Sequence, residues 1–383
     1  MKTIITAVTL AATAFAFGQR TKPGEQFIPV NTIFSTETTP LTFKLGDFFG
    51  ENAVLDSLVD MHFNQLSYGE RVGQLLMPAV GRYGQEYSKI ERLTQEGKIG
   101  GVLMLNGSKV QFANWIKDLN AINDSLNYLP FLYSADAEPS LINRKISGTP
   151  TIQKANTLQT KAEVIKCAQE ISDELTEIGI NYNFAPVVDM SPNKTVGWRS
   201  FGHEPDSVIS WSSEFIQQTQ SNNIIATAKH FPGHGYVTGD THKQLVYIDG
   251  ELKELHNYPG LIADSVLSIM VAHIAVKNNP TYNTNDMPAT TSKKIVTDLL
   301  RDSLNFEGLI VTDAMNMGGV RNVDKAEVLA VQAGCDILLM PLDADLAHQR
   351  LLGLYSLDED FRNQVNTACK RIIRAKIAMG LMH

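Results

Sequence analysis

The stretch Gly308-Leu-Ile-Val-Thr-Asp313 joins a short apolar run to a single carboxylate at its end. Similar runs, rich in β-branched residues, recur along the chain at 74–80, 99–105, 129–136, 180–189, 224–230, 267–276, 308–313 and 335–341. Most of them are apolar almost throughout, which is typical of strands that are buried on both faces of a parallel sheet. The stretch therefore indicates one strand of a parallel sheet that helices cover.

Amphipathic stretches of helix length separate many of these runs. The clearest is 161–179, which ends on Gly179 where a C-terminal cap is expected. Its apolar face carries Ile165, Ala168, Leu175 and Ile178. Further helices are predicted at 206–222, 291–304, 324–334 and 357–379. Eight strands alternating with helices predict an α/β fold of the (β/α)8 TIM-barrel type in a single domain. A doubly wound sheet is the alternative, but no glycine-rich nucleotide-binding motif follows any run.

The composition is that of a globular, acidic chain. Of the 383 residues 43% are hydrophobic and 19% are charged, and 33 Lys and Arg against 41 Asp and Glu give a net charge of −8. A net-acidic chain without a basic run lacks the charge pattern of a nucleic-acid binder. Cys167, Cys335 and Cys369 are far apart, which predicts neither a disulfide framework nor a CxxC metal site. We expect Cys167 and Cys335 to be small core residues.

Residues 1–18 have the pattern of a secretory signal peptide. Lys2 precedes an apolar run over 3–17, and Ala16-Phe17-Gly18 places small residues before Gln19. The run is shorter than the ~20 residues of a transmembrane helix, and no later segment is long and apolar enough to span a membrane. We expect cleavage before Gln19 and export to the periplasm or the extracellular space; a mildly apolar tail is the alternative. We expect residues 19–60 to form a lead-in and 61–383 to form the barrel domain.

Polar residues stand at or near the carboxyl ends of five runs. These residues are Asp136, Asp189, Lys229 with His230, His273 and Asp313. In a barrel this is the face that carries the chemistry. Each residue alone could simply cap the next helix or turn. Their coincidence at corresponding places predicts a functional site.

The sequence predicts a loop over 228–242, because the glycines and the proline there break regular structure. This histidine loop reads Ala228-Lys-His-Phe-Pro-Gly-His-Gly-Tyr-Val-Thr-Gly-Asp-Thr-His242. Asp240 and His242 are two residues apart, so their side chains can meet in a turning loop. The carboxylate would then orient one ring nitrogen and leave the other for a substrate. Two alternatives remain, namely a metal-dependent hydrolase with His230, His234, Asp240 and His242 as ligands, or structural histidines. Asp313, on a rigid strand end, is suited to be a nucleophile in sugar chemistry, paired with His242.

Together these segments resemble glycoside hydrolase family 3, in its β-N-acetylglucosaminidase branch. The family's loop pattern K-H-[FL]-P-G-H-G, followed by D-[ST]-H, stands here at 229–235 and 240–242. The nucleophile pattern matches 306–317 and ends on Met317. The segments 183–189 and 199–202 resemble the family's strand-four and R-S-F-G signatures. The resemblance runs from about residue 73 to residue 334.

The resemblance implies a retaining exo-β-N-acetylglucosaminidase that acts on peptidoglycan fragments without a cofactor. It implies Asp313 as the nucleophile and His242 as the acid/base, oriented by Asp240. The substrate contacts that it implies are Lys229, His230, Arg199, Asp136 and Met317. The D-x-H pair favours an N-acetylhexosamine over the substrates of β-glucosidases and other β-hexosidases of the family. Phosphorolysis and a sugar-binding barrel that has lost turnover are further alternatives.

The sequence departs from the family pattern at two places. The family usually continues after its strand-three aspartate with Q-E-G-G-R or a Trp-Gly variant, whereas Asp136 is followed here by Ala137-Glu138-Pro139-Ser140. The loss of both glycines and the presence of Pro139 predict a changed path for this loop. His203-Glu204 after R-S-F-G is also unusual. Neither change reaches the nucleophile or the Asp240–His242 dyad.

Overall fold

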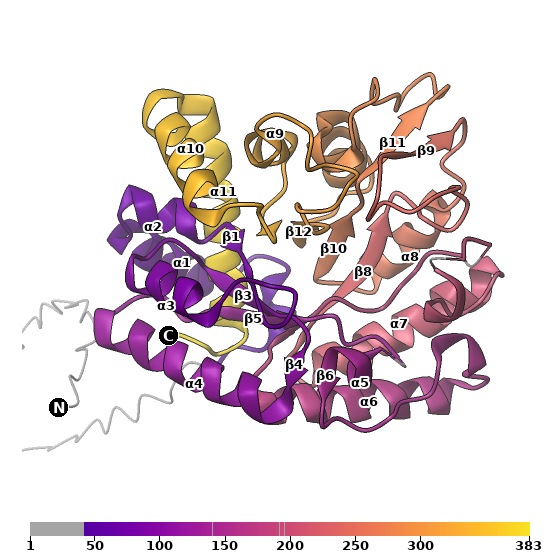
Figure 1. Ribbon diagram of the computed structural model, residues 1–383, viewed down its shortest axis with the longest axis horizontal. Coiled ribbons are helices and arrows are strands. Elements are labelled where there is room, and N and C mark those ends of the chain that lie inside the picture. Colours follow the sequence, from indigo (N-terminus) through magenta and orange to yellow (C-terminus); the bar gives the residue numbers. More distant parts are fainter. Residues whose placement is uncertain (1–41, 140, 191, 195) are drawn as a thin grey trace, which may run out of the picture. The chain divides into compact units, whose positions relative to one another are not determined.

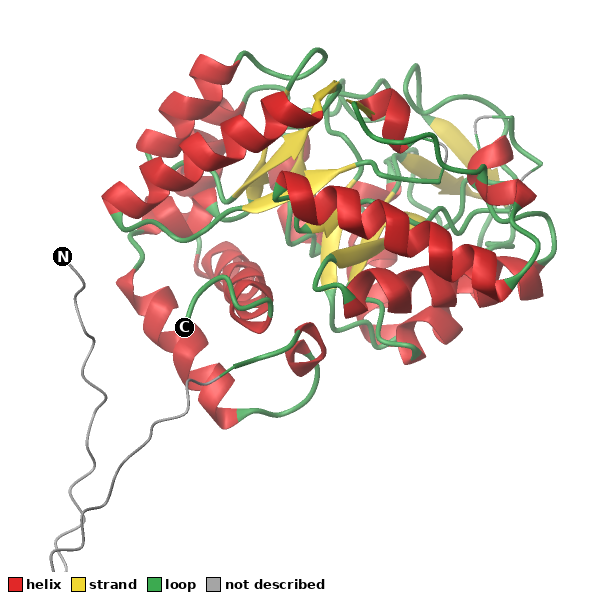
Figure 2. Cartoon of the chain, turned by 90° about the horizontal axis from the view of Figure 1, so that it is seen from below, coloured by secondary structure: helices red, strands yellow, loops and turns green. Residues whose placement is uncertain are grey.

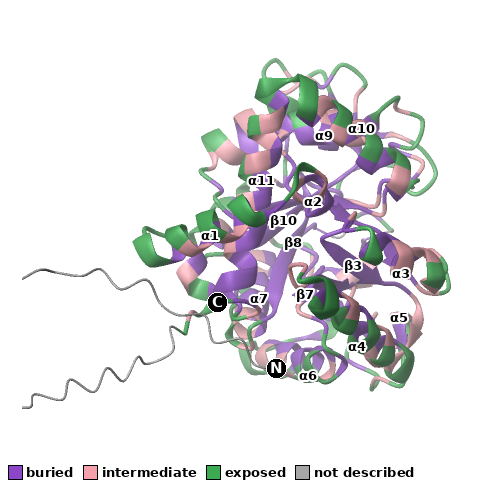
Figure 3. Cartoon of the chain, turned by 90° about the vertical axis from the view of Figure 1, so that its left-hand side faces the viewer, coloured by how far each residue is buried: buried purple, intermediate pink, exposed green. Residues whose placement is uncertain are grey.

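The computed structural model describes residues 42–383 except 140, 191 and 195. The predicted signal peptide and the lead-in up to residue 41 lie outside the described residues. Within the described part, parallel strands lie at the centre and helices surround them (Figures 1 and 2). The strands are buried, and the helices turn their exposed faces outward (Figure 3).

Seven of the described strands pair in parallel in the order β12-β10-β8-β7-β5-β3-β2. Their bounds are β2 (Ala79–Val80), β3 (Gly101–Met104), β5 (Leu132–Ala135), β7 (Tyr182–Asn183), β8 (Ile225–Phe231), β10 (Ser268–Val271) and β12 (Leu309–Thr312). Each strand arises from one of the apolar runs of the sequence. Every residue of these strands is buried, as expected for a sheet covered on both faces.

Backbone hydrogen bonds close this sheet into a ring. β1 (Leu76–Met77) directly precedes β2 and pairs in parallel with β13 (Leu338–Leu339). The segment before β13 meets β12 through a bridge between Ile337 and Val311, where the N–H of Thr312 donates to the carbonyl oxygen of Ile337 at 3.0 Å. β2 pairs with β3 on the other side. The ring confirms the predicted barrel and brings the carboxyl ends of all its strands to one face.

The five predicted helices form, and further helices accompany them. α6 (Lys161–Ile178) begins with a capping box between Thr160 and Glu163 and ends at Gly179, whose φ of 93° suits glycine. The other helices are α1 (Ala53–Gln65), α2 (Tyr68–Gly73), α3 (Tyr87–Gln95), α4 (Lys109–Leu126), α5 (Ile142–Lys145), α7 (Pro205–Ser221), α8 (Tyr258–Ala263), α9 (Ala326–Ala333), α10 (Ala344–Leu357) and α11 (Glu359–Ala378). Short 3₁₀ segments are η1 (Leu45–Phe48), η2 (Ala155–Thr157), η3 (Gly197–Arg199), η4 (Leu255–Asn257) and η5 (Ala289–Thr291). The predicted helix over 291–304 forms as the π-helix η6 (Lys294–Ser303).

The structure differs from the predicted pattern in two respects. The run over 267–276 splits into β10 and β11 (Ile274–Lys277), and β11 pairs with β9 (Val246–Asp249) outside the ring. A small apolar cluster joins these two strands to Val237 of the histidine loop. The run over 74–80 also forms two strands, β1 and β2.

The three cysteines are free and buried, as expected for Cys167 and Cys335. In the described part of the chain, no helix is both long and apolar enough to cross a lipid bilayer.

Lys376 of α11 is fully buried near the amino ends of β1 and β3. Its Nζ donates to Gln74 Oε1 at 2.6 Å and to the carbonyl oxygen of Gly100 at 3.1 Å. Both acceptors are neutral. Burial lowers the pKa of Lys376 to about 7, because the charged form loses its hydration.

This buried amine gives the fold a testable pH dependence. An unfolded lysine titrates near ~10.4, so between pH 7 and pH 10 the unfolded chain binds a proton that the folded chain lacks. The contribution of Lys376 to the free energy of unfolding therefore rises with pH in this window, by at most about 1.4 kcal/mol per pH unit. We expect the difference in free energy of unfolding between the wild type and Lys376→Met, measured with urea, to rise from pH 7 to pH 10. A difference as flat as that of the exposed control Lys166→Met would contradict this.

Candidate active site

The carboxyl ends of the ring strands surround a cavity of about 390 Å³. Ligand sites of barrels lie at this face. Seven of the eight predicted site residues line the cavity, namely Asp136, Arg199, Lys229, His230, His242, Asp313 and Met317. The eighth, Asp240, is hydrogen-bonded to His242. The structure thus brings together side chains from loops that are far apart in the sequence.

Asp313 stands at the carboxyl end of β12. Its Oδ1 accepts a hydrogen bond from the N–H of Ala314 at 2.8 Å. Burial would raise the pKa of Asp313, but the imidazoles of His230 and His273 outweigh it and hold the pKa below its ordinary value. The carboxylate is therefore ionised at neutral pH. A charged oxygen on a rigid strand end faces the cavity, as the sequence predicts.

The contact predicted between Asp240 and His242 is present. His242 Nδ1 lies 2.8 Å from Asp240 Oδ1, and the backbone N–H of His242 donates to the same oxygen at 3.0 Å. Burial would raise the pKa of Asp240, but the hydrogen bonds with His242 lower it. The carboxylate thus stays charged and fixes the ring orientation. The side chain of His242 is 64% exposed, so its ring can meet both a ligand and solvent.

Backbone contacts join this dyad to the segment that follows Asp313. The N–H of Gly318 donates to the carbonyl oxygen of His242, and the N–H of Gly319 donates to that of Thr241, both at 3.0 Å. A Cβ atom on Gly318 would stand 2.1 Å from the carbonyl oxygen of Lys243. Only glycine therefore permits this approach. The two predicted catalytic segments hold each other in place.

Lys229 is buried at the end of β8 and meets two carboxylates. Its Nζ lies 3.0 Å from Asp136 Oδ1 and 2.6 Å from Glu138 Oε1. Arg199 donates from Nε and Nη2 to the two oxygens of Glu138, each at 2.7 Å. Burial would lower the pKa of Lys229, but Asp136 and Glu138 raise it. The ammonium group stays charged, and Lys145 approaches Asp136 at 3.8 Å.

Glu138 is a site residue that sequence reasoning treated only as part of an altered loop. It is fully buried, and Arg199 and Lys229 together outweigh that burial and hold its pKa far below the ordinary value. α5 and the pairing of β6 (Ile146–Ser147) with β4 (Gly107–Ser108) support its loop. The sequence signal was the spacing, because the family pattern also has a glutamate two residues after the aspartate. The altered loop still leaves Asp136 beside Lys229.

Asp189 orients the first half of the histidine loop. Its Oδ2 lies 2.7 Å from His230 Nδ1, and its Oδ1 accepts the backbone N–H groups of His230 and His234 at 3.1 and 2.8 Å. His230 therefore presents a fixed ring to the cavity that it lines. The sequence marked Asp189 only as a polar strand end.

Three of the four residues of the metal-site alternative line the cavity, but their ring nitrogens have other partners. His230 pairs with Asp189, His242 pairs with Asp240, and His234 Nε2 lies 3.2 Å from Thr241 Oγ1. Over residues 42–383, apart from the three undescribed positions, no group of three or more His, Cys, Asp or Glu is arranged to hold a metal ion.

Two further buried groups support the site. His273 Nε2 lies 3.0 Å from the carbonyl oxygen of Ala314 and Nδ1 lies 2.7 Å from Thr290 Oγ1. Burial lowers the pKa of His273, so the ring is neutral at neutral pH. It fixes the backbone directly after Asp313. The other group, Glu254, lies behind the histidine loop, and no sequence pattern had drawn attention to it.

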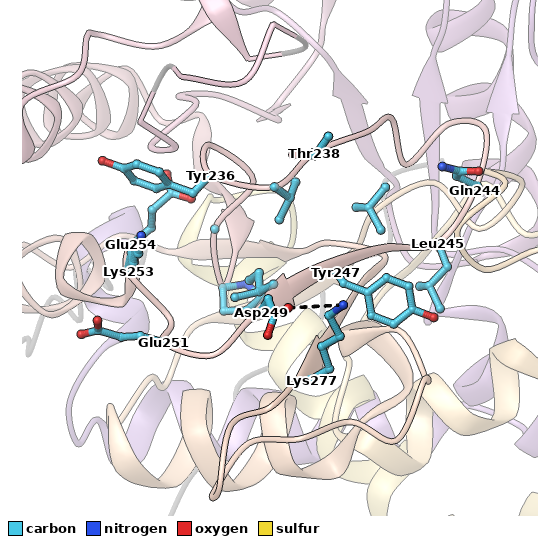
Figure 4. A pocket seen from close by; sticks show the side chains of 15 residues that line it. Tyr236, Thr238, Gln244, Leu245, Tyr247, Asp249, Glu251, Lys253, Glu254 and Lys277 are labelled. Carbon is cyan, nitrogen blue, oxygen red and sulfur yellow. Dashed lines mark ion pairs between the residues drawn. The ribbon is translucent and has the colours of Figure 1, made fainter.

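A second cavity of about 600 Å³ lies beside the histidine loop (Figure 4). Tyr236 and Tyr247 line it with partly exposed rings. Lys277 pairs there with Asp249 at 3.3 Å. This cavity is separate from the one that holds Asp313, and Glu254 borders it.

Known proteins share the sequence pattern of this chain. The model of the Glycosyl hydrolase family 3 N terminal domain matches residues 67–375. The chain belongs to glycosyl hydrolase family 3. The resemblance found in the sequence is thereby confirmed, and the ring of parallel strands is the barrel of this family.

Family 3 relatives cover much of the chain. Beta-hexosaminidase A of Pseudoalteromonas piscicida is 30% identical over 284 residues, which are 66% of this chain and 48% of that protein. A beta-hexosaminidase of Nitrosomonas eutropha is 29% identical over 74% of this chain and 84% of its own. The solved structure of a family 3 beta-N-acetylglucosaminidase from Paenibacillus sp. str. FPU-7 has 26% identity and a TM-score of 0.74, covering 82% of this chain and 63% of that one. The chain spans about half the length of the first of these relatives.

The charge network around Glu138 predicts a stability effect. Glu138→Gln removes a buried carboxylate from two cations, and breaking a buried ion pair in this way costs about 3–5 kcal/mol. We expect a loss of that size in the free energy of unfolding, measured with urea at pH 7. The matched control is Glu170→Gln, because Glu170 lies on the surface 3.7 Å from Lys166 and should contribute less than about 1 kcal/mol. Equal losses for both variants would contradict the assigned network.

Proposed function

We propose that this chain is a retaining exo-β-N-acetylglucosaminidase that hydrolyses terminal β-linked N-acetylglucosamine. The observation that carries the proposal is the joint placement of an ionised Asp313 and the Asp240–His242 dyad, linked through the Gly318 contact. Membership of glycosyl hydrolase family 3 and relatives named beta-hexosaminidase support it. The dyad favours an N-acetylhexosamine as the sugar.

The reaction has two steps. An oxygen of Asp313 attacks the anomeric carbon, the bond to the leaving oxygen breaks, and that oxygen takes a proton from His242. In the second step His242 takes a proton from water, the water oxygen attacks the same carbon, and the ester to Asp313 breaks. Two inversions retain the configuration. Asp240 stabilises the imidazolium whenever the ring carries its second proton.

Polar side chains in the cavity of Asp313 bind the sugar. Lys229, His230, Arg199 and Asp136 line the same cavity as Asp313, and Met317 adds an apolar wall. Buried, charged donors with fixed geometry suit sugar hydroxyl groups. Glu138 and Asp136 hold Lys229 in position, so the sugar meets groups that are already ordered.

The decisive experiment follows the release of 4-nitrophenol from the β-N-acetylglucosaminide and from the β-glucoside. The wild type should prefer the acetamido substrate, with or without EDTA. Asp313→Ala should lower kcat by at least about a thousandfold, because the nucleophile is gone. Azide should then restore turnover and give the α-glycosyl azide, because it attacks from the face that the carboxylate used.

The exposed Asp324, in the loop that precedes α9, supplies a matched control. Asp324→Ala should keep wild-type rates. A β-configured azide product, or full activity of Asp313→Ala, would contradict the assignment of the nucleophile. A glycosyl phosphate formed in phosphate buffer would indicate phosphorolysis. A wild type that binds the sugar without turnover would indicate a binding barrel.

We further propose that the chain is exported and acts on peptidoglycan fragments that carry a terminal N-acetylglucosamine. The apolar run over 3–17 and the small residues before Gln19 support export. The mature protein, produced with its native N-terminus in a secreting bacterium, should begin at Gln19 by mass spectrometry. An exported chain that still carries Met1 would contradict the predicted cleavage.

A further inference from the structure

We propose that Glu254 is a positioning residue for the Asp240–His242 dyad: its buried carboxyl group fixes the histidine loop from a cavity other than the one that holds Asp313. The inference rests on the proposed function, because the dyad is the acid/base of that reaction. Glu254 lines the second cavity and not the one that holds Asp313. It therefore acts through the loop and touches no substrate.

The carboxyl group of Glu254 joins two segments of backbone. Oε1 accepts the N–H of Met190 at 2.5 Å, and Oε2 accepts the N–H of Gly235 at 2.8 Å. The N–H of Tyr236 also hydrogen-bonds to this side chain. Met190 directly follows Asp189, which holds the loop from another side. One side chain, only 3% exposed, thus ties the histidine loop to the backbone directly after Asp189.

The glycines of the loop make room for this side chain. A Cβ atom on Gly233 would stand 2.5 Å from Glu254 Oε2, and one on Gly235 would stand 2.5 Å from Oε1 and 1.8 Å from the carbonyl oxygen of Met190. Real side chains cannot approach so closely. The Pro-Gly-His-Gly sequence is therefore matched to the buried carboxyl group, and the two form one packed unit.

Contacts continue from this unit to the dyad. His234, between the two glycines, reaches Thr241 Oγ1 with Nε2 at 3.2 Å. Thr241 directly precedes His242. Figure 4 shows Glu254 close to Tyr236 in the second cavity. A displacement of Gly235 and Tyr236 would therefore move His234 and, through Thr241, also His242.

The charges around Glu254 explain why its backbone N–H donors are important. Burial, followed by the negative charge of Asp189, raises the pKa of Glu254, while the N–H groups of Met190, Gly235 and Tyr236 act in the opposite direction. His230 and His234 lie on the loop above, Lys253 is adjacent in sequence and exposed, and Glu251 is exposed at the cavity edge. The backbone N–H groups stabilise this buried carboxyl group, and the carboxyl group satisfies these N–H groups. If either partner is lost, the other is left buried without its hydrogen bond.

The test compares two leaving groups in the full chain. Glu254→Gln keeps the side-chain volume, but its NH₂ group faces one of the backbone N–H groups, so one hydrogen bond to the loop is lost. A misplaced acid slows a poor leaving group most, because only that group needs the proton. We expect kcat for the methyl β-N-acetylglucosaminide to fall at least about tenfold more than kcat for the 4-nitrophenyl substrate, within the range of general acid catalysis. KM should change little.

Two further variants serve as a positive and a neutral control. His242→Ala should change the ratio of the two kcat values in the same direction and further, and Glu251→Gln, at the same cavity edge, should leave it unchanged. The ratio does not depend on how much of the variant is folded, so a loss of stability cannot imitate the effect. A Glu254→Gln variant with equal losses on both substrates, or with no loss, would overturn the inference. A wild type without turnover of either substrate would overturn the proposed function itself.

Discussion

The hydrogen bonds that close the strand ring are the constraint on which the site depends. β13 meets β12 on one side and β1 on the other, through Ile337 and the pair of Leu76 with Leu338. Because the closed strands are all parallel, their carboxyl ends form one rim. Asp136 follows β5 and Asp313 follows β12, four places apart in the strand order, and both line one cavity because the ring is closed. An open sheet with the same strands would spread these residues along an edge.

Charge pairing then separates the roles of the carboxylates at the rim. Asp136 and Glu138 each lie beside a lysine, and Glu138 also accepts two hydrogen bonds from Arg199. Asp313 accepts the N–H of Ala314, and the imidazoles that surround it lower its pKa without a direct ion pair to Lys or Arg among the described residues. An oxygen that is charged but not held by a cation keeps its lone pairs for a carbon atom. The pairing pattern thus separates Asp313, which we propose as the nucleophile, from Asp136 and Glu138, which pair with cations.

The sequence predicted the parts of this arrangement that local patterns encode. Apolar runs that end in Asp313 or Lys229 predicted buried strands, and the two-residue spacing predicted the contact of Asp240 with His242. The split of 267–276 into β10 and β11 could not be predicted, because it depends on pairing with β9 after the distant histidine loop. Glu254 was missed for the same kind of reason, since its partners Met190 and Gly235 become neighbours only in the fold.

The histidine loop combines two physical requirements that conflict. In the proposed reaction His242 must face both substrate and solvent, and its side chain is 64% exposed. An exposed side chain on a glycine-rich loop is poorly ordered unless other groups fix its backbone. In this loop, buried groups fix the backbone. The carboxyl groups of Asp189 and Glu254 accept N–H groups of the first half of the loop, and the N–H of Gly318 donates to the second half. An imidazole at this position also avoids a second negative charge near Asp313, which would raise the pKa of that carboxyl group.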